Sequence, residues 1–230
     1  MQVNEEMIFY AKVNCPNCGK EFLHPEVKTK YISIEKQDSD FCSYYSSINP
    51  LFYDVLICKH CGYGFTKETN VPLSEPEKAA INTILSGWHT EGAQYTGLRS
   101  LEQAVKAYNL AILCQELRNA KDSVKGSLYL RLGWLYRYQG QKENEAKSLQ
   151  RALEFLKRAY ERESTSEVKK ELRMMYLLGD LSYRNGNLKE ALQWFQAVTQ
   201  HPQVDRYPVF ARMSRARWQD IREELKQQKA

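Results

Sequence analysis

Hydrophobic and polar side chains alternate along much of the first third of the chain, as they do in half-buried β-strands. The alternation is clear in residues 7–13, and residues 21–24 would form the strand that returns beside it. A second alternating stretch covers residues 27–36, and a β-branched and aromatic run covers residues 51–57. We therefore expect a small β module with strands at these positions.

Residues 67–73 predict a linker, because after them the composition shifts from strand formers to Leu, Ala, Glu, Lys and Arg. The sequence Ser74-Glu75-Pro76-Glu77 favours a helix start. Its serine is a good N-cap, its proline suits the first turn, and its last glutamate completes a capping box. We expect this helix to end near Gly87.

The rest of the chain has a helical period and repeats itself. A small-x-x-x-large-x-x-small pattern occurs three times: Ala104, Tyr108 and Ala111; Ala152, Leu156 and Ala159; Ala191, Phe195 and Val198. Before the last two sets, residues 132–140 and 178–186 carry a Leu-Gly pair, an aromatic residue and a turn glycine. This order resembles the tetratricopeptide repeat, a helix-turn-helix unit of about 34 residues, although the first alanines of the sets lie 48 and 39 residues apart. Residues 210–226 would form a terminal capping helix.

Two matched Cys-x-x-Cys-Gly motifs supply the candidate metal ligands Cys15, Cys18, Cys58 and Cys61. Two thiolates at this spacing reach one face of a tight turn, and the glycine that follows allows the turn. Four thiolates leave no open position, which is typical of one structural zinc ion. His24 and His60 are alternative ligands, and redox chemistry is the alternative role, although redox motifs normally occur singly.

Together these patterns predict an α+β protein that is mostly α. Residues 1–70 would form a zinc-ribbon-like module, and residues 74–230 a tetratricopeptide-like α-helical repeat solenoid. The 39 residues between Cys18 and Cys58 exceed the usual gap of about 15–20, so they leave room for an extra loop.

The formal net charge of +5 is unevenly distributed. Residues 1–70 hold 7 Lys against 9 Asp and Glu, so the positive excess lies in the helical part. Modules that bind nucleic acid usually bring basic side chains to the phosphates, so a protein partner is favoured over nucleic acid. No apolar run approaches the roughly 18 residues of a membrane span, and the N-terminus lacks signal-peptide features. We therefore expect a cytoplasmic protein with no membrane partner.

The loop before the second cysteine pair contains Asp38, Asp40, Cys42 and Tyr45. Long ordered loops are disproportionately functional, so these residues are a candidate functional loop. Cys42 is either a buried residue that packs the loop or a nucleophile beside one of the aspartates. In the helical part, Arg131, Trp134 and Tyr176 are candidate partner contacts, because aromatic and basic side chains in such helices can line a groove.

Four separated motifs of the N-terminal third, read in order, resemble a bacterial family, the domain of unknown function 2225. They are Cys15 to Gly19, Asp38 to Tyr45, Asn49 to Val55, and Cys58 to Tyr63. The resemblance implies a bacterial protein that joins this segment to a tetratricopeptide-like helical part. It implies no catalytic residues.

The sequence thus predicts a non-catalytic, zinc-binding adaptor that binds a protein or peptide through a helical-repeat groove. Two other functions stay open. One is nucleic-acid binding through the ribbon or the basic last helix, and the other is a thiol-dependent enzyme that uses Cys42.

Overall fold

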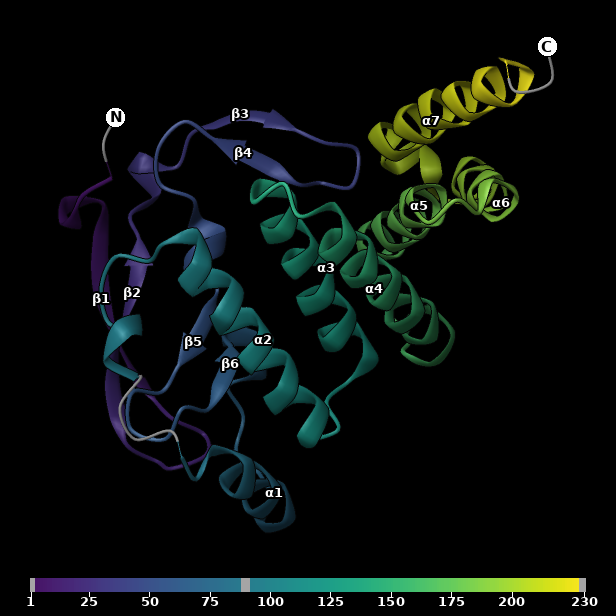
Figure 1. Cartoon of the computed structure of the whole chain (residues 1–230). Helices are drawn as coiled ribbons and strands as arrows, with labels where there is room; N and C mark the ends of the chain where they lie inside the picture. Colours follow the sequence, from purple (N-terminus) through teal and green to yellow (C-terminus); the bar gives the residue numbers. More distant parts are fainter. Residues whose placement is uncertain (1–2, 88–91, 228–230) are drawn as a thin grey trace.

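The computed structural model describes residues 3–87 and 92–227 (Figure 1). Six strands in this part form three antiparallel hairpins. β1 (Ile8–Asn14) pairs with β2 (Glu21–Val27), so that Ile8 faces Val27 and Asn14 faces Glu21. The other hairpins join β3 (Ile34–Gln37) to β4 (Ser43–Tyr45), and β5 (Val55–Ile57) to β6 (Gly64–Thr66). The expected strands at 7–13 and 21–24 are confirmed.

Two expected strands are shorter than their hydrophobic patterns suggested. In 27–36, a 3-10 turn at Thr29–Tyr31 interrupts the alternation, and only its end joins β3. In 51–57, the Asn49 side chain accepts from the Leu51 amide and Pro50–Tyr53 forms another 3-10 turn. The predicted strands at 27–36 and 51–57 are therefore wrong in extent, because local turn bonds replaced strand pairing.

Seven α-helices follow in the described part, and mostly α architecture is confirmed. The first begins with the expected Ser74 capping box and ends two residues before Gly87. The last spans the predicted capping segment. They are α1 (Glu75–Leu85), α2 (Leu101–Leu117), α3 (Asp122–Tyr138), α4 (Lys142–Arg162), α5 (Val168–Arg184), α6 (Leu188–Thr199) and α7 (Pro208–Gln227). None of these helices combines the length and apolarity that a bilayer crossing requires.

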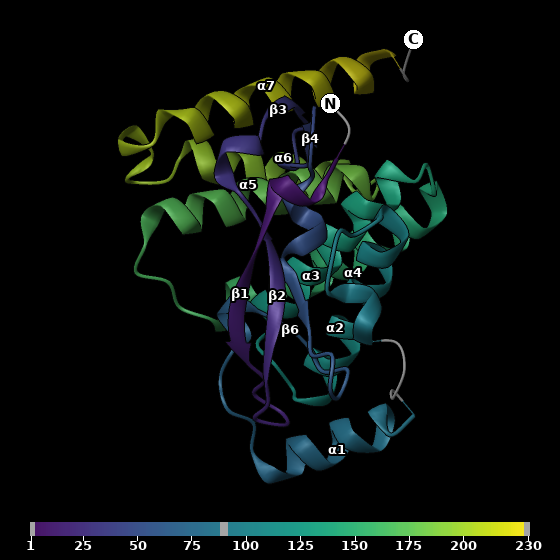
Figure 2. The same cartoon turned by 90° about the vertical axis from the view of Figure 1, so that its left-hand side faces the viewer.

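Helix α2 lies across β5 and β6, and its buried face forms one core with them (Figures 1 and 2). Ala104, Tyr108 and Ala111, the first occurrence of the repeated pattern, are fully buried. Ala111 approaches the strand so closely that a Cβ on Gly64 would lie 2.8 Å from its Cα. The two predicted modules, 1–70 and 74–230, therefore touch at this helix; their division into domains stays a prediction.

We expect Gly64→Ala to destabilise the protein by about 1–3 kcal/mol, because the added methyl group meets rigid backbone rather than a flexible side chain. Urea denaturation monitored by circular dichroism measures this loss. Gly87→Ala is the matched control, since among the described residues, its chain neighbours aside, none has an atom within 4 Å of the added Cβ. Equal stabilities of the two variants would contradict the close packing of α2 on β6.

The remaining helices form two hairpins, α3–α4 and α5–α6, with α7 packed on α5 and α6. The Leu-Gly pairs lie where the helices of each hairpin touch. A Cβ on Gly133 would lie 2.7 Å from Leu149, and one on Gly179 would lie 2.7 Å from Phe195. The predicted turn glycines, Gly140 and Gly186, have φ of 70° and 78° and end the first helix of each pair. Both hairpins thus have the expected internal contacts, and their assembly as a solenoid stays a prediction.

Candidate functional site

The two cysteine motifs form turns with the same backbone hydrogen bonds. The Gly19 amide donates to the Cys15 carbonyl at 2.9 Å, and the Gly62 amide donates to the Cys58 carbonyl at 2.8 Å. Both glycines lie in the left-handed region, with φ of 71° and 75°. A residue with a Cβ is strained there, so glycine is what lets each turn bring its two thiols to one side.

The turns bring four sulfur atoms together. The Sγ atoms of Cys15 and Cys61 are 3.7 Å apart, as are those of Cys18 and Cys58, and all four lie within 4.8 Å of one another. A metal with metal–sulfur bonds of about 2.3 Å in a tetrahedron needs sulfur–sulfur edges of about 3.8 Å. The donor set and its spacing therefore fit a metal ion, which these four cysteines could hold.

The thiols also shift one another's ionisation. Hydrogen bonds from the Cys15 and Cys58 thiols lower the pKa of Cys61. The hydrogen bonds of Cys15 to Cys58 and Cys61 raise the pKa of Cys15. One thiolate is therefore easily formed, whereas several at this distance need a cation to neutralise them.

Neither histidine joins the cluster. His24 is 1% exposed, and its Nε2 lies 2.9 Å from the carbonyl oxygen of Tyr53. The Nε2 of His60 lies 3.1 Å from the carbonyl oxygen of Glu21. The cluster is instead tied to the first helix. The Asn17 side-chain amide lies 3.6 Å from the Cys61 Sγ and donates to Asn82 of α1 at 2.8 Å. Order at the cysteines is thus coupled to the position of α1.

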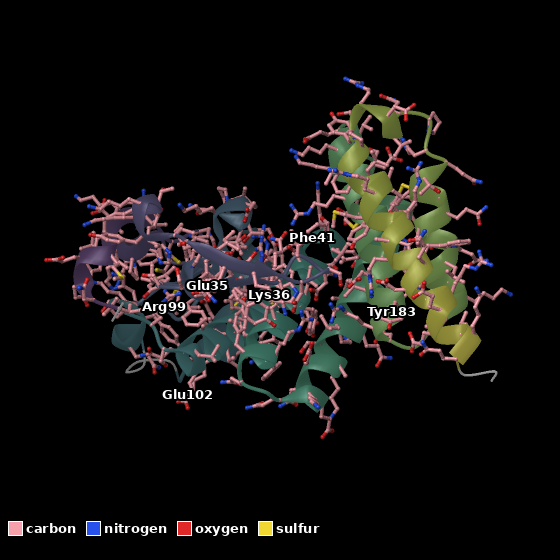
Figure 3. The ribbon with its side chains drawn as sticks, turned by 90° about the horizontal axis from the view of Figure 1, so that it is seen from above. Glu35, Lys36, Phe41, Arg99, Glu102 and Tyr183 are labelled. Atoms are coloured by element: carbon pink, nitrogen blue, oxygen red, sulfur yellow. The ribbon has the colours of Figure 1, made fainter. Side chains whose placement is uncertain are left out.

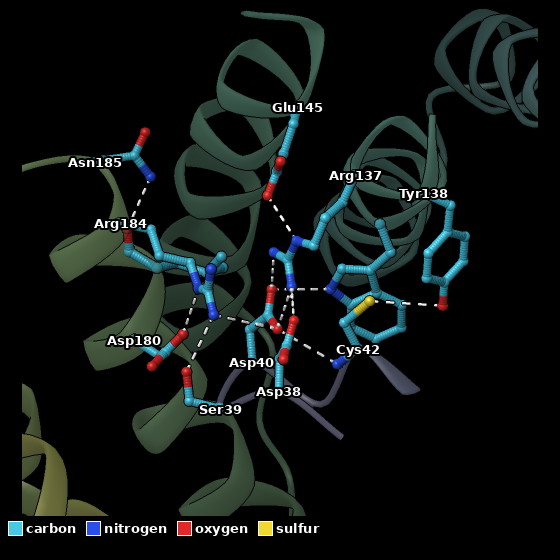
Figure 4. Close-up of polar contacts among 12 residues, drawn as sticks. Asp38, Ser39, Asp40, Cys42, Arg137, Tyr138, Glu145, Asp180, Arg184 and Asn185 are labelled. Carbon is cyan, nitrogen blue, oxygen red and sulfur yellow. Dashed lines mark hydrogen bonds and ion pairs between the residues drawn. The ribbon is translucent and has the colours of Figure 1, made fainter. Parts of the chain in front are cut away.

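The candidate loop residues Asp38 and Asp40 form a buried ion network with α3 (Figure 4). The Arg137 guanidinium donates to Asp38 at 3.0 Å, to Asp40 at 2.6 and 3.0 Å, and to Glu145 at 2.7 Å. Asp40 is fully buried and also accepts from the Trp134 indole at 3.0 Å. Burial alone would raise the pKa of Asp40, but the arginines hold it below its usual value. Both aspartates are therefore engaged with the protein itself.

The network continues from the hairpin to the last helix. Arg184 of α5 lies 3.5 Å from Asp40 and donates to Asp180 at 2.7 Å, and Arg217 of α7 donates to Asp180 at 2.9 Å. Asp180 is fully buried. The β3–β4 hairpin, α3, α5 and α7 are thus joined through two buried carboxylates.

Cys42 lies inside this loop without the environment of a reactive thiol. It is fully buried, and its Sγ lies 3.5 Å from the Tyr138 hydroxyl. Burial raises the pKa of Cys42 to about 11, whereas nucleophilic cysteines have a lowered pKa. The geometry favours the packing role over the catalytic one.

We expect the Cys42 thiol of the native protein to resist iodoacetamide at neutral pH, because little thiolate forms and the sulfur is covered. Mass spectrometry of tryptic peptides measures the labelling. After denaturation with a chelator present, Cys42 should label like the other cysteines. Rapid native labelling at Cys42 would revive the thiol-enzyme hypothesis.

A cleft of about 520 Å³ lies between the β3–β4 hairpin, the Pro50–Tyr53 turn and helices α3 and α5. One face of α3 and one face of α5 supply most of its wall. From α3 come Ser123, Ser127, Leu130, Arg131 and Trp134, and from α5 come Lys170, Arg173, Met174 and Leu177. The hairpin contributes Gln37, Phe41, Ser43 and Tyr45, and Asp54 also lines the cleft. A cavity of this size that combines apolar walls with polar and charged side chains is typical of a binding site.

The predicted partner contacts occupy different environments. Arg131 lines the cleft with a side chain that is 28% exposed. Trp134 is 9% exposed and lines its floor, and Tyr176 is 1% exposed, between Phe41 and Phe195. Arg131 is thus the most open of the three, Trp134 keeps a small exposed surface in the cleft, and Tyr176 is covered. Tyr45 of the candidate loop also lines the cleft.

Two arginines that are central to the ion network and the cleft carry no signal in the sequence. Arg137 lies 97 residues from Asp40, so its role depends on tertiary structure. Arg173 belongs to none of the sequence motifs, yet it lies in the cleft over Phe41, 4.5 Å from the ring centre. Phe41 itself has φ of 70°, unusual for a residue with a Cβ, and it faces the C-terminal helices at the end of the hairpin (Figure 3).

Comparison with known proteins supports one assignment. No curated protein and no solved structure matches the chain. The model of a family described as an uncharacterized protein conserved in bacteria matches residues 8–221, which include the four cysteines, the aspartate loop and the cleft. The chain therefore belongs to this family, the domain of unknown function 2225.

Proposed function

We propose that the protein is a non-catalytic adaptor, in which one structural zinc ion holds the β module and the cleft between α3 and α5 binds a protein or peptide partner. In this proposal the α3–α4 and α5–α6 hairpins are tetratricopeptide-like units, and α3 and α5, the first helix of each, face the partner. The protein would act in the cytoplasm, where thiols stay reduced and available to a metal.

The cysteine cluster suits a structural zinc ion better than a catalytic metal ion. Four thiolates fill a tetrahedron, so no position is left for water or substrate. The hairpins around the cluster are short, and small β units of this kind commonly depend on a metal for folding. The metal's role would be to hold β1–β2 and β5–β6 together, and through Asn17 to place α1.

The cleft is the observation that carries the binding proposal. It is built on two helices whose relative position is held by the buried Asp40 and Asp180 network, so its walls are preorganised. Preorganised walls reduce the ordering cost of binding. Its polar groups are arginine, lysine and serine side chains, with Asp54 as the carboxylate in its lining.

Site-specific crosslinking tests the proposal. A photo-crosslinking amino acid at Ser127, inside the cleft, should give a discrete adduct in a bacterial lysate, and the same residue at exposed Lys106 of α2 should not. The captured protein must then bind the purified chain, and Ser127→Tyr, which narrows the cleft, must weaken that binding. Crosslinking at Ser127 no stronger than at Lys106 would overturn the proposal.

Nucleic-acid binding stays a sequence prediction, and no feature of the cleft favours it over a protein partner. On the last helix, Asp220 pairs with Arg217 and Glu224 accepts from Tyr183, so acidic groups interrupt the basic stripe. The thiol-enzyme alternative loses support, since Cys42 is buried with a raised pKa.

A further inference from the structure

We propose that the partner of the cleft is an acidic peptide segment, whose carboxylates pair with Arg173 and Arg131 while an apolar side chain packs on Trp134. This inference rests on the proposed function and specifies the chemistry of the partner.

Arg173 is the strongest evidence, because its charge lacks a counterion. Its guanidinium lies over the Phe41 ring, 4.5 Å from the centre, and forms no hydrogen bond or ion pair with any residue that the structure describes. Burial and the nearby charge of Arg131 lower the pKa of Arg173. Arg173 is exposed on α5, so the five N–H donors of its guanidinium are open to solvent and available to an anionic ligand.

Arg131 adds a second cation whose own partner is weakly held. Its Nε lies 3.9 Å from an oxygen of Asp54, too far for a hydrogen bond. The Asp54 side chain is 43% exposed, so solvent screens this pair and it holds Arg131 only weakly. Arg131 also lines two smaller pockets beside the cleft, where a longer bound segment could continue.

The charges of the lining favour an anion. Arg131, Lys170 and Arg173 face a single carboxylate, Asp54, and Lys170 lies at the exposed rim. The apolar part of the wall includes Leu130 and Trp134 from α3 and Met174 and Leu177 from α5. Arginine pairs plus an aromatic floor suit a segment that alternates acidic and apolar side chains.

Selection from a randomised short-peptide phage library tests this inference. The wild-type chain should enrich acidic peptides that contain an apolar residue. A synthetic peptide with the most enriched sequence should bind the purified chain, as measured by fluorescence anisotropy. Arg173→Glu and Arg131→Glu should each raise the dissociation constant of that peptide by about tenfold or more, because the new glutamate repels the acidic side chains of the peptide. Lys169→Glu is the matched control, with the same charge change at an exposed position of α5 outside the cleft. Affinity should fall as salt rises.

The outcomes separate the two proposals. Enrichment of neutral or basic peptides whose binding is unchanged by Arg173→Glu would contradict the inference of an acidic partner. The proposal that the cleft binds a peptide would then still stand. Failure of both the peptide selection and the Ser127 crosslink would overturn the binding cleft as well. If Arg173→Glu lowers the melting temperature, Arg173→Gln serves instead, because it removes the charge and keeps much of the aliphatic side chain. If Arg173→Gln binds the peptide as tightly as the wild type, the inference is also contradicted.

Discussion

Asp40→Ala is expected to destabilise the protein by about 3–5 kcal/mol, one of the largest effects of any single substitution. The carboxylate is fully buried and accepts from Arg137, Trp134 and the Cys42 amide. Its removal leaves Arg137 and Arg184 close together in the protein without the charge that balances them. Removal of one partner from a buried pair costs much more than the pair itself contributes.

Equilibrium unfolding in urea measures this loss, with Lys36→Ala as the control on the same hairpin. Lys36 pairs with Asp38, but its side chain is 68% exposed, so its loss should cost less than about 1 kcal/mol. Similar stabilities for the Asp40 and Lys36 variants would show that the network does not hold the hairpin to the helices.

The same network predicts a pH dependence. The folded protein lowers the pKa of Asp40, while the unfolded chain keeps a value near about 3.9. The unfolded state then binds the proton first as pH falls, so the contribution of Asp40 is complete above about pH 4 and declines below it. The stability difference between wild type and Asp40→Ala should therefore narrow in that acidic range, and a constant difference would contradict the ionised pair.

Cys58→Ser is expected to abolish stoichiometric metal binding and to destabilise the chain by at least about 4 kcal/mol. Cys58 is fully buried, in a core with Leu56, Tyr63 and Phe65. A serine at this place gives zinc a poor fourth ligand and leaves a buried hydroxyl among apolar groups. Metal analysis after dialysis and thermal unfolding measure the two effects.

Cys42→Ser is the matched control for this variant. Cys42 is equally buried but lies outside the cluster, and a serine there can still bond the Tyr138 hydroxyl. We expect full metal content and a loss of about 1 kcal/mol. Loss of metal from both variants would point to general unfolding rather than to a lost ligand.

The sequence predicted best what local rules determine. The paired Cys-x-x-Cys-Gly motifs predicted two turns that meet, and the structure brings their sulfurs within 4.8 Å. Ser74, Gly140 and Gly186 predicted a helix start and two helix ends, because capping chemistry is local. The Leu-Gly pairs and the turn glycines after them predicted helix-turn-helix units, and in the structure Gly133 and Gly179 lie where the paired helices touch.

What could not be predicted depends on residues far apart in the chain. Asp38 and Asp40 looked like candidates for chemistry, but their partner Arg137 lies almost a hundred residues away and neutralises them. Tyr176 looked like a groove residue, but the side chain of Phe41 covers it. The strands at 27–36 and 51–57 were overextended, since an alternating pattern does not reveal where a 3-10 turn competes with pairing.

Native mass spectrometry of untagged protein purified without chelators, followed by thiol counting, tests the central claim most directly. We expect the mass of one zinc ion per chain, with the thiols of Cys15, Cys18, Cys58 and Cys61 protected until the metal is removed. A metal-free chain with a reversible disulfide among these cysteines would contradict it and point to thiol redox chemistry.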